Sequence, residues 1–153
     1  MKVLLKSVDI GSKYDDKVYD YWIKGQLISG QVIEIFDAAP FDLRKYEGKT
    51  IEGLIIATFV QVVYNTDNVD ENLTSGTFLG KYNINNKWDN IYEGGNKIYE
   101  SVSEWYGIKT DDGIFLLTLN IGDLNAIKEG EIIFLKIGRY DLLAWRPIER
   151  PRF

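Results

Sequence analysis

The sequence predicts a mainly β protein with one short helix, and three observations support this prediction. Apolar residues occur in short blocks, several of which are rich in the β-branched and aromatic side chains typical of strands. Clusters of glycine, asparagine and aspartate separate these blocks. The 153 residues contain only three prolines and no low-complexity linker, so we expect a single domain over residues 1–153.

The first part of the chain is expected to form three strands. Residues 3–8 form a short strand, and residues 24–36 form a long one, because apolar side chains occupy both of its alternating faces. Gly25 and Gly30 predict bends or bulges within that long strand. Residues 50–64 form the third strand, since their interior is almost continuously apolar.

Less regular segments surround these strands. Residues 37–49 contain Pro40, which cannot donate a hydrogen bond to a sheet, and they predict a turn region. Residues 65–75 are polar and acidic and predict a loop, and a strand over 77–84 follows it. Residues 96–106 fit both a strand and one face of a capped helix, and we favour the short helix.

The C-terminal part predicts a hairpin and two further strands. Residues 106–110 and 114–120 flank an Asp-Asp-Gly turn, in which Asp112 and Gly113 supply the positive φ values of a type I′ turn. Residues 131–137 and 140–145 predict two strands that Gly138 and Arg139 separate.

This order of elements, five or more strands with one helix after the strand over 77–84, is typical of a small closed or partly open β-barrel of the OB type. An SH3-like barrel or a small β-sandwich would give nearly the same pattern. No internal repeat aligns within the sequence.

The residue types that are missing argue against several kinds of chemistry. The chain contains no histidine and no cysteine, so the usual acid–base group, the thiolate nucleophile and the soft metal ligands are all absent. Serine and threonine therefore lack the base that normally activates them. We expect no enzyme activity, no cofactor and no metal site.

The location of the protein is expected to be cytoplasmic. The apolar blocks are much shorter than the roughly 20 residues of a membrane span, and residues 1–6 lack the apolar core of a signal peptide. We therefore expect no attachment to a membrane. The adjacent carboxylate pairs, such as Asp15–Asp16 and Asp111–Asp112, are interpreted as solvated turns rather than catalytic pairs.

A group of aromatic side chains between residues 82 and 106 is the one positive indication of a binding surface. Tyr82, Trp88 and Tyr92 are interleaved with asparagines, a mixture that suits a protein interface, a sugar platform or the stacking of single-stranded bases. Trp105 is interpreted as core packing, and Trp145 as core packing or a cation–π partner.

Charge and aromatic content together predict a non-catalytic binding protein. The net charge of −5 and the acidic loop with Asp67, Asp70 and Glu71 favour a basic protein partner, as for an inhibitor or immunity-type protein. The alternative is an OB-like barrel that binds an oligonucleotide or oligosaccharide, with Arg139 and Arg146 as its cations. The overall negative charge argues against nucleic acid.

Overall fold

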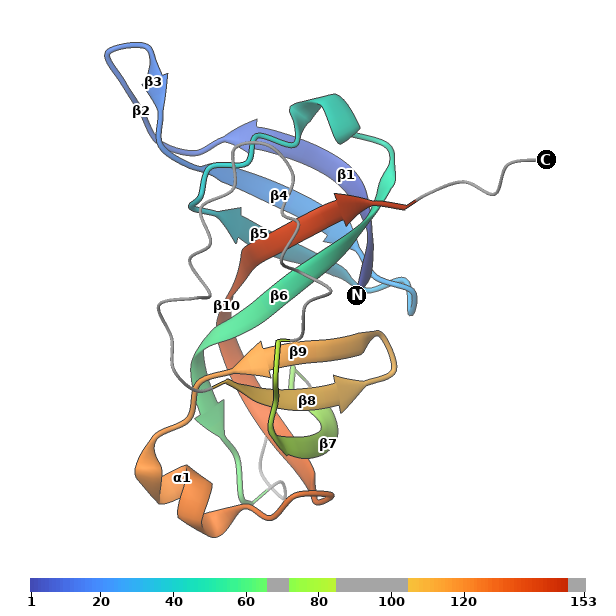
Figure 1. Ribbon diagram of the computed structural model, residues 1–153, viewed down its shortest axis with the longest axis vertical. Coiled ribbons are helices and arrows are strands. Elements are labelled where there is room, and N and C mark those ends of the chain that lie inside the picture. The colour runs from blue at the N-terminus through green and yellow to red at the C-terminus, as the bar shows by residue number, and fades with distance from the viewer. Residues whose placement is uncertain (66–71, 85–104, 149–153) are drawn as a thin grey trace, which may run out of the picture.

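The computed structural model describes residues 1–65, 72–84 and 105–148, and this part of the chain is mainly β with one short α-helix (Figure 1). Eight strands form one mixed sheet, and two short strands form a separate hairpin. In chain order the elements are β1 Lys2–Ile10, β2 Lys13–Tyr14, β3 Lys17–Val18, β4 Tyr21–Gln26, β5 Val32–Asp37, the 3-10 helix η1 Arg44–Tyr46, β6 Thr50–Val62, β7 Thr74–Lys81, β8 Tyr106–Thr110, β9 Gly113–Leu117, α1 Ile121–Ala126 and β10 Ile132–Pro147.

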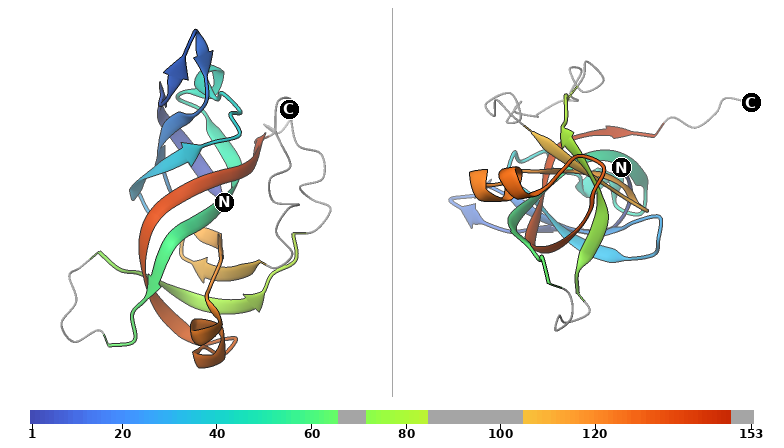
Figure 2. Two further views of the ribbon diagram at one scale, coloured as in Figure 1. Left: turned by 90° about the vertical axis from the view of Figure 1, so that its left-hand side faces the viewer. Right: turned by 90° about the horizontal axis from the view of Figure 1, so that it is seen from below.

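The eight-stranded sheet closes on itself twice. Its strand order is β1-β4-β5-β10-β6-β9-β8-β7, and two additional pairings join β1 to β6 and β10 to β7. The first ring therefore contains β1, β4, β5, β10 and β6, and the second ring contains β7, β8, β9, β6 and β10. The first ring lies above the second in Figure 1, and the long strands β6 and β10 run from one to the other, as the left view of Figure 2 also shows.

The two rings are built from the same pattern of strand pairings. Each half of the chain supplies three antiparallel strands, a short helix and one long strand. The third strand of each half runs parallel to the long strand of the other half, so β5 pairs with β10 and β9 pairs with β6. Each half thus completes the ring of the other, a repeat that the sequence did not reveal.

The repeat extends to individual backbone hydrogen bonds. In the first half the N–H of Gly48 donates to the carbonyl of Leu5 at 2.7 Å, and in the second half that of Gly130 donates to Phe78 at 2.7 Å. The two glycines have φ values of 82° and 87°. A register shift directly follows Leu5 in β1 and Phe78 in β7. These matches fix which residues of the two halves correspond.

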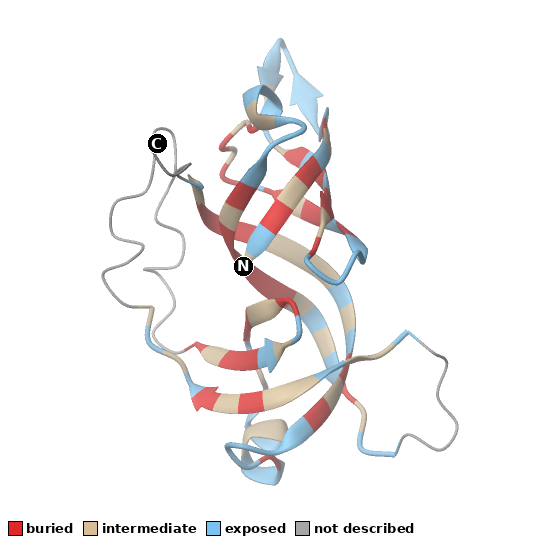
Figure 3. Ribbon diagram, turned by 90° about the vertical axis from the view of Figure 1, so that its right-hand side faces the viewer, coloured by how far each residue is buried: buried red, intermediate tan, exposed pale blue. Residues whose placement is uncertain are grey.

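The interiors of the two rings share one hydrophobic core. Leu43, just before η1, is fully buried in this core, and Ile127, just after α1, is buried as well. The strands alternate between buried and exposed residues, as Figure 3 shows for several of them. A second, smaller cluster lies outside the shared core and includes Trp105, Leu116 and Leu143.

Three of the predicted strands, in two regions of the chain, differ from the structure. Residues 24–36 are not one long strand: β4 ends at Gln26, a turn with Gly30 at a φ of 92° follows, and β5 begins at Val32. Conversely, residues 131–137 and 140–145 belong to one continuous strand, β10, which Gly138 does not interrupt. In both places the polar and glycine residues were misinterpreted, because pairing with neighbouring strands outweighs local propensity.

The other predicted elements agree more closely. The strands over 3–8, 50–64 and 77–84 are confirmed as β1, β6 and β7, and the hairpin is confirmed as β8 and β9. Its turn is not type I′, because Asp112 does not have a positive φ. The helix predicted over 96–106 falls mostly outside the described residues, and the described helix is α1.

Candidate functional site

A row of stacked side chains lies on the outer surface of the first ring. The rings of Trp22 and Phe36 are 4.8 Å apart between centroids, and the guanidinium of Arg139 lies 4.7 Å from the centroid of Phe36. The same guanidinium lies 5.2 Å from the centroid of Phe59. The stacked row Trp22–Phe36–Arg139–Phe59 therefore crosses β4, β5, β10 and β6. Its two ends are the most open, with Trp22 38% and Phe59 75% exposed.

The alternation of the strands places these side chains outside the ring. Tyr21 and Ile23 are buried in β4, so Trp22 between them points outward. Ile35 and Asp37 are buried in β5, and Phe36 between them points to the same outer side, directly opposite Trp22 in the register. The row is thus a consequence of the strand register and does not depend on a loop.

Phe59 stands out because its backbone has a φ of +52° in the middle of a strand. This conformation is costly for a bulky side chain, on the order of 1–3 kcal/mol. Gly138 of the neighbouring strand makes room for it, since a Cβ at Gly138 would lie only 2.7 Å from the Cβ of Phe59. Strained residues of this kind concentrate at binding and catalytic sites.

The charges beside the row are nearly balanced. Arg139 makes two hydrogen bonds to Asp141, at 2.7 and 3.0 Å, so its charge is already compensated. Lys24 and Glu34 lie opposite each other in the β4–β5 register. Arg146, the second predicted cation, is paired with Glu52 at 2.7 Å. Arg139 and Arg146 are therefore each compensated by a carboxylate and do not act as two free cations.

The corresponding position in the second half carries a buried tryptophan. In the first half, Asp9 lies opposite Trp22. The corresponding pair in the second half is Tyr82 and Trp105, in which the N–H of Tyr82 donates to the carbonyl of Trp105 at 2.8 Å. Trp105 is only 7% exposed and packs in the second cluster with Leu116. The residue that corresponds to Leu116 in the first half is the exposed Glu34.

Of the aromatic and acidic binding residues predicted from the sequence, only Tyr82 lies within the described residues. It is partly buried and packs against the second cluster rather than forming an open surface. The predicted binding residues Trp88, Tyr92, Asp67, Asp70 and Glu71 lie outside the described residues. Trp145 is confirmed as core packing, with its ring 4.8 Å from that of Tyr46.

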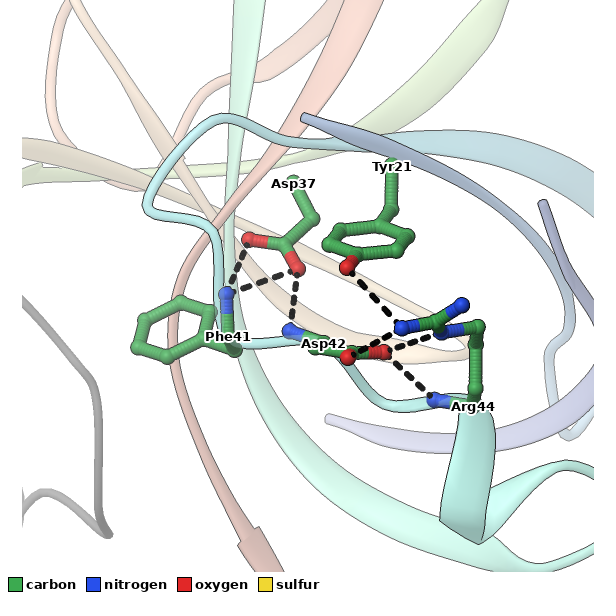
Figure 4. A network of polar contacts seen from close by, with 5 residues as sticks. All are labelled: Tyr21, Asp37, Phe41, Asp42 and Arg44. Atoms are coloured by element: carbon green, nitrogen blue, oxygen red, sulfur yellow. Dashed lines mark hydrogen bonds and ion pairs between the residues drawn. The ribbon is translucent and has the colours of Figure 1, made fainter. Parts of the chain in front are cut away.

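A buried carboxylate organises the segment that follows β5 (Figure 4). The oxygens of Asp37 accept hydrogen bonds from the backbone N–H groups of Ala39, Phe41 and Asp42, at 2.9–3.3 Å. Burial raises the pKa of Asp37 above its ordinary value, although these N–H donors act in the opposite direction. Since the backbone occupies both oxygens, we assign Asp37 a structural role.

Next to it, Asp42 and Arg44 form a surface pair. The guanidinium of Arg44 donates two hydrogen bonds of 2.7 Å to the carboxylate of Asp42 and one of 3.3 Å to the hydroxyl of Tyr21. The hydrogen bonds from Arg44 lower the pKa of Asp42. These groups are partly exposed, so the pair contributes little to stability.

A cavity of about 610 Å³ lies between the two rings. The β4–β5 turn, the β8–β9 turn and the start of β7 form its walls, and β10 contributes Ile137 and Tyr140. The two turns are joined by Ser29, whose N–H and hydroxyl donate to Asp112 at 2.7 and 2.9 Å. Asp112 is thus a buried structural acceptor, whereas the sequence predicted a solvated turn residue.

Comparisons with known proteins do not assign the chain to a family. No protein-family model, no curated protein and no solved structure matches the chain. Among residues 1–65, 72–84 and 105–148, no three acidic side chains are grouped so that they could hold a metal ion. No helix in these same ranges is long and apolar enough to cross a membrane.

Proposed function

We propose that this chain is a non-catalytic binding protein and that the stacked row on the first ring is the centre of its contact with a protein partner. The observation that supports the proposal is the row itself: Trp22 and Phe59 are exposed, and Phe36 and Arg139 hold them in one preorganised stack. Tryptophan and arginine are, with tyrosine, the residues enriched at the energetic centres of protein interfaces.

The charge of the chain favours a basic partner. With a net charge of −5, the chain attracts a positively charged protein during diffusion and repels nucleic acid. Neither Arg139 nor Arg146 is available as a free phosphate contact, since each is hydrogen-bonded to a carboxylate. The acidic residues Asp67, Asp70 and Glu71 are proposed to contribute to this steering.

The topology supports a second candidate. Each ring has three antiparallel strands, a helix and two long strands with one parallel pairing, and we propose that both rings are small OB-type barrels. Such barrels bind oligonucleotides or oligosaccharides on their second and third strands. In the first ring these are β4 and β5, which carry Trp22 and Phe36.

A comparison of captured proteins tests the first proposal. The tagged chain is used to isolate partners from its native host, alongside the variants Trp22→Ala and Phe59→Ala. Tyr14→Ala and Ile121→Ala serve as matched controls, because both side chains are strongly exposed elsewhere on the chain. We expect one basic protein to be retained by the native chain and by the controls, with at least about tenfold less retained by the row variants.

Two results would overturn this proposal. One is retention of the same protein by all variants alike, and the other is failure of the native chain to retain any protein selectively. A titration of the full chain with single-stranded DNA and with oligosaccharides, followed by tryptophan fluorescence, tests the second candidate. Binding that Trp22→Ala abolishes and Tyr14→Ala preserves would replace the first candidate by the second.

A further inference from the structure

We propose that the cavity between the two rings receives a lysine or arginine side chain of the protein partner, with Glu34 and Asp111 at its charged end. This inference rests on the proposed function, because it names a second contact with the same basic partner. The cavity and the stacked row adjoin along β5, which contributes Glu34 to the cavity and Phe36 to the row.

The lining of the cavity has the chemistry that a long cationic side chain requires. Carboxylates of Glu34, Asp111 and Asp112 line it, and no lysine or arginine from residues 1–65, 72–84 or 105–148 does. Ile137 and Phe115 add apolar wall surface, against which the methylene stem of such a side chain can pack. Lys24 lies opposite Glu34 in the register but does not line the cavity.

Two of the three carboxylates are placed to meet a ligand. Asp112 is buried and already accepts two hydrogen bonds from Ser29, so it holds the two turns together. Glu34 and Asp111 are exposed residues at the same cavity. Their charges are therefore accessible to an incoming cation, while the Ser29–Asp112 contact keeps the walls in place.

The repeat shows which residues lie at the corresponding place in the other ring. When β1 is aligned with β7, Met1 corresponds to Thr74. When β5 is aligned with β9, Gln31 corresponds to Gly113. Thr74 and Gln31 both line the cavity. Met1 and Gly113, by contrast, are in contact, since a Cβ at Gly113 would lie 3.6 Å from that of Met1.

The unbranched side chain of Met1 thus lies at the corresponding place and packs against the shared core. Gln31 and Thr74, by contrast, line an open cavity. An unbranched side chain that ends in a positive charge combines the shape of that internal occupant with the carboxylates found here. Lysine and arginine are the two residues that have both properties.

A titration with agmatine tests this inference, because agmatine is decarboxylated arginine and keeps the methylene stem and the guanidinium of the arginine side chain. The full-length chain is labelled with nitrogen-15, and amide shifts are followed by NMR, with butanol as an uncharged probe. We expect saturable shifts for agmatine at Ser29, Thr74 and Asp111, and none for butanol. The double variant E34Q and D111N is expected to weaken binding by about tenfold or more, as two charge-assisted contacts are lost.

The control variant carries Asp15→Asn and Asp16→Asn, which remove the same charge from an exposed hairpin. It is expected to bind agmatine as the native chain does. The inference is overturned if agmatine causes no saturable shift at the cavity, or if E34Q with D111N binds it as tightly as the control. Failure of the protein-partner proposal would instead appear in the capture experiment with Trp22→Ala, which does not involve the cavity.

Discussion

The two halves of this protein use one scaffold for opposite purposes, as their two corresponding tryptophans show. Trp22 stacks on Phe36 and remains 38% exposed, whereas Trp105 is 7% exposed among aliphatic side chains. The strand pairings around them match, so the pairings do not determine the difference. It arises from the outward-facing neighbours, which are Lys24 and Glu34 in one half and Gly107 and Leu116 in the other. Charged neighbours keep one face open, and apolar neighbours let the other become core.

The largest difference between the halves is expected for alanine at the two tryptophans. Trp105→Ala should lower the free energy of unfolding by about 3–5 kcal/mol, the usual cost of removing a buried aromatic side chain. Trp22→Ala should lower it by less than about 1 kcal/mol, because the side chain already contacts water. Urea unfolding of both variants measures the contrast. Equal costs would mean that the two faces do not differ in burial.

The next contrast is between the segment that follows β5 in the first half and the segment that follows β9 in the second half. Asp37 accepts backbone hydrogen bonds inside the protein, whereas the corresponding region of the second half uses Asn120, which caps α1 at the surface through a 2.8 Å bond from Asp123. Asp37→Asn should cost about 1–3 kcal/mol, since an amide nitrogen would face N–H donors. Asn120→Ala should cost about 1 kcal/mol. Thermal unfolding that ranked the two variants in the reverse order would contradict this account.

Of these two segments, only the one with Asp37 should make the free energy of unfolding depend on pH. The pKa of Asp37 is raised in the folded state, so the folded chain binds a proton more tightly than the unfolded chain does. The stability that this tighter proton binding contributes is fully present below the ordinary pKa of 3.8. It is lost as the pH rises through the raised pKa. The stability advantage of the native chain over Asp37→Asn should therefore shrink from acidic to neutral pH. A constant difference across that range would exclude the raised pKa.

The repeat itself predicts equal effects at corresponding glycines. Gly48 and Gly130 both have positive φ, and open space surrounds the position of an added Cβ at each. Each Gly→Ala variant should therefore cost about 1–2 kcal/mol from backbone strain alone. The double variant should show the sum of the two costs, because the sites are independent. A cost at one glycine and none at the other would show that the halves differ at this position.

The smallest expected effect on stability is at Phe59. Phe59→Gly removes a strained φ and little buried surface, so the free energy of unfolding should stay the same or rise by up to about 1 kcal/mol. The same variant should weaken partner binding. A clear loss of stability would indicate that Phe59 is a structural residue, and the strain would then have no link to binding.

Much of the fold could be predicted from the sequence, but the exchange between the halves could not. The apolar run of β6 and the Asp-Gly hairpin are local signals, and both identified their elements correctly. The division of residues 132–147 into two strands was wrong, because the pairing of β10 with β6, β7 and β5 is not encoded near Gly138. Only short Asp-Leu and Glu-Gly matches, at 42–48 and 123–130, mark the repeat in the sequence.

The candidate site was only partly accessible from the sequence. Arg139 was identified as a cation of the alternative function, but its aromatic neighbours Phe36 and Phe59 were overlooked in favour of the denser aromatic segment over 82–106. Trp22, which stacks on Phe36, was overlooked as well. The sequence did contain a signal that could have identified Trp22. Trp22 alternates with the buried Tyr21 and Ile23, on the same side of its strand as Lys24. A tryptophan on the polar side of a strand is a candidate contact residue. Its place in one row with Phe36, Arg139 and Phe59 depends on long-range strand pairing, which local patterns do not give.

Fluorine NMR of the chain labelled with fluorotryptophan tests the central claim most directly. Single Trp→Phe variants assign the resonances, and the change in shift between light and heavy water reports the exposure of each tryptophan. We predict a clear solvent effect for Trp22 in the free chain, its loss when the basic partner is added, and no effect for Trp105 in either state. A Trp22 resonance that remains equally sensitive to solvent in the complex would contradict the assignment of the stacked row as the binding surface.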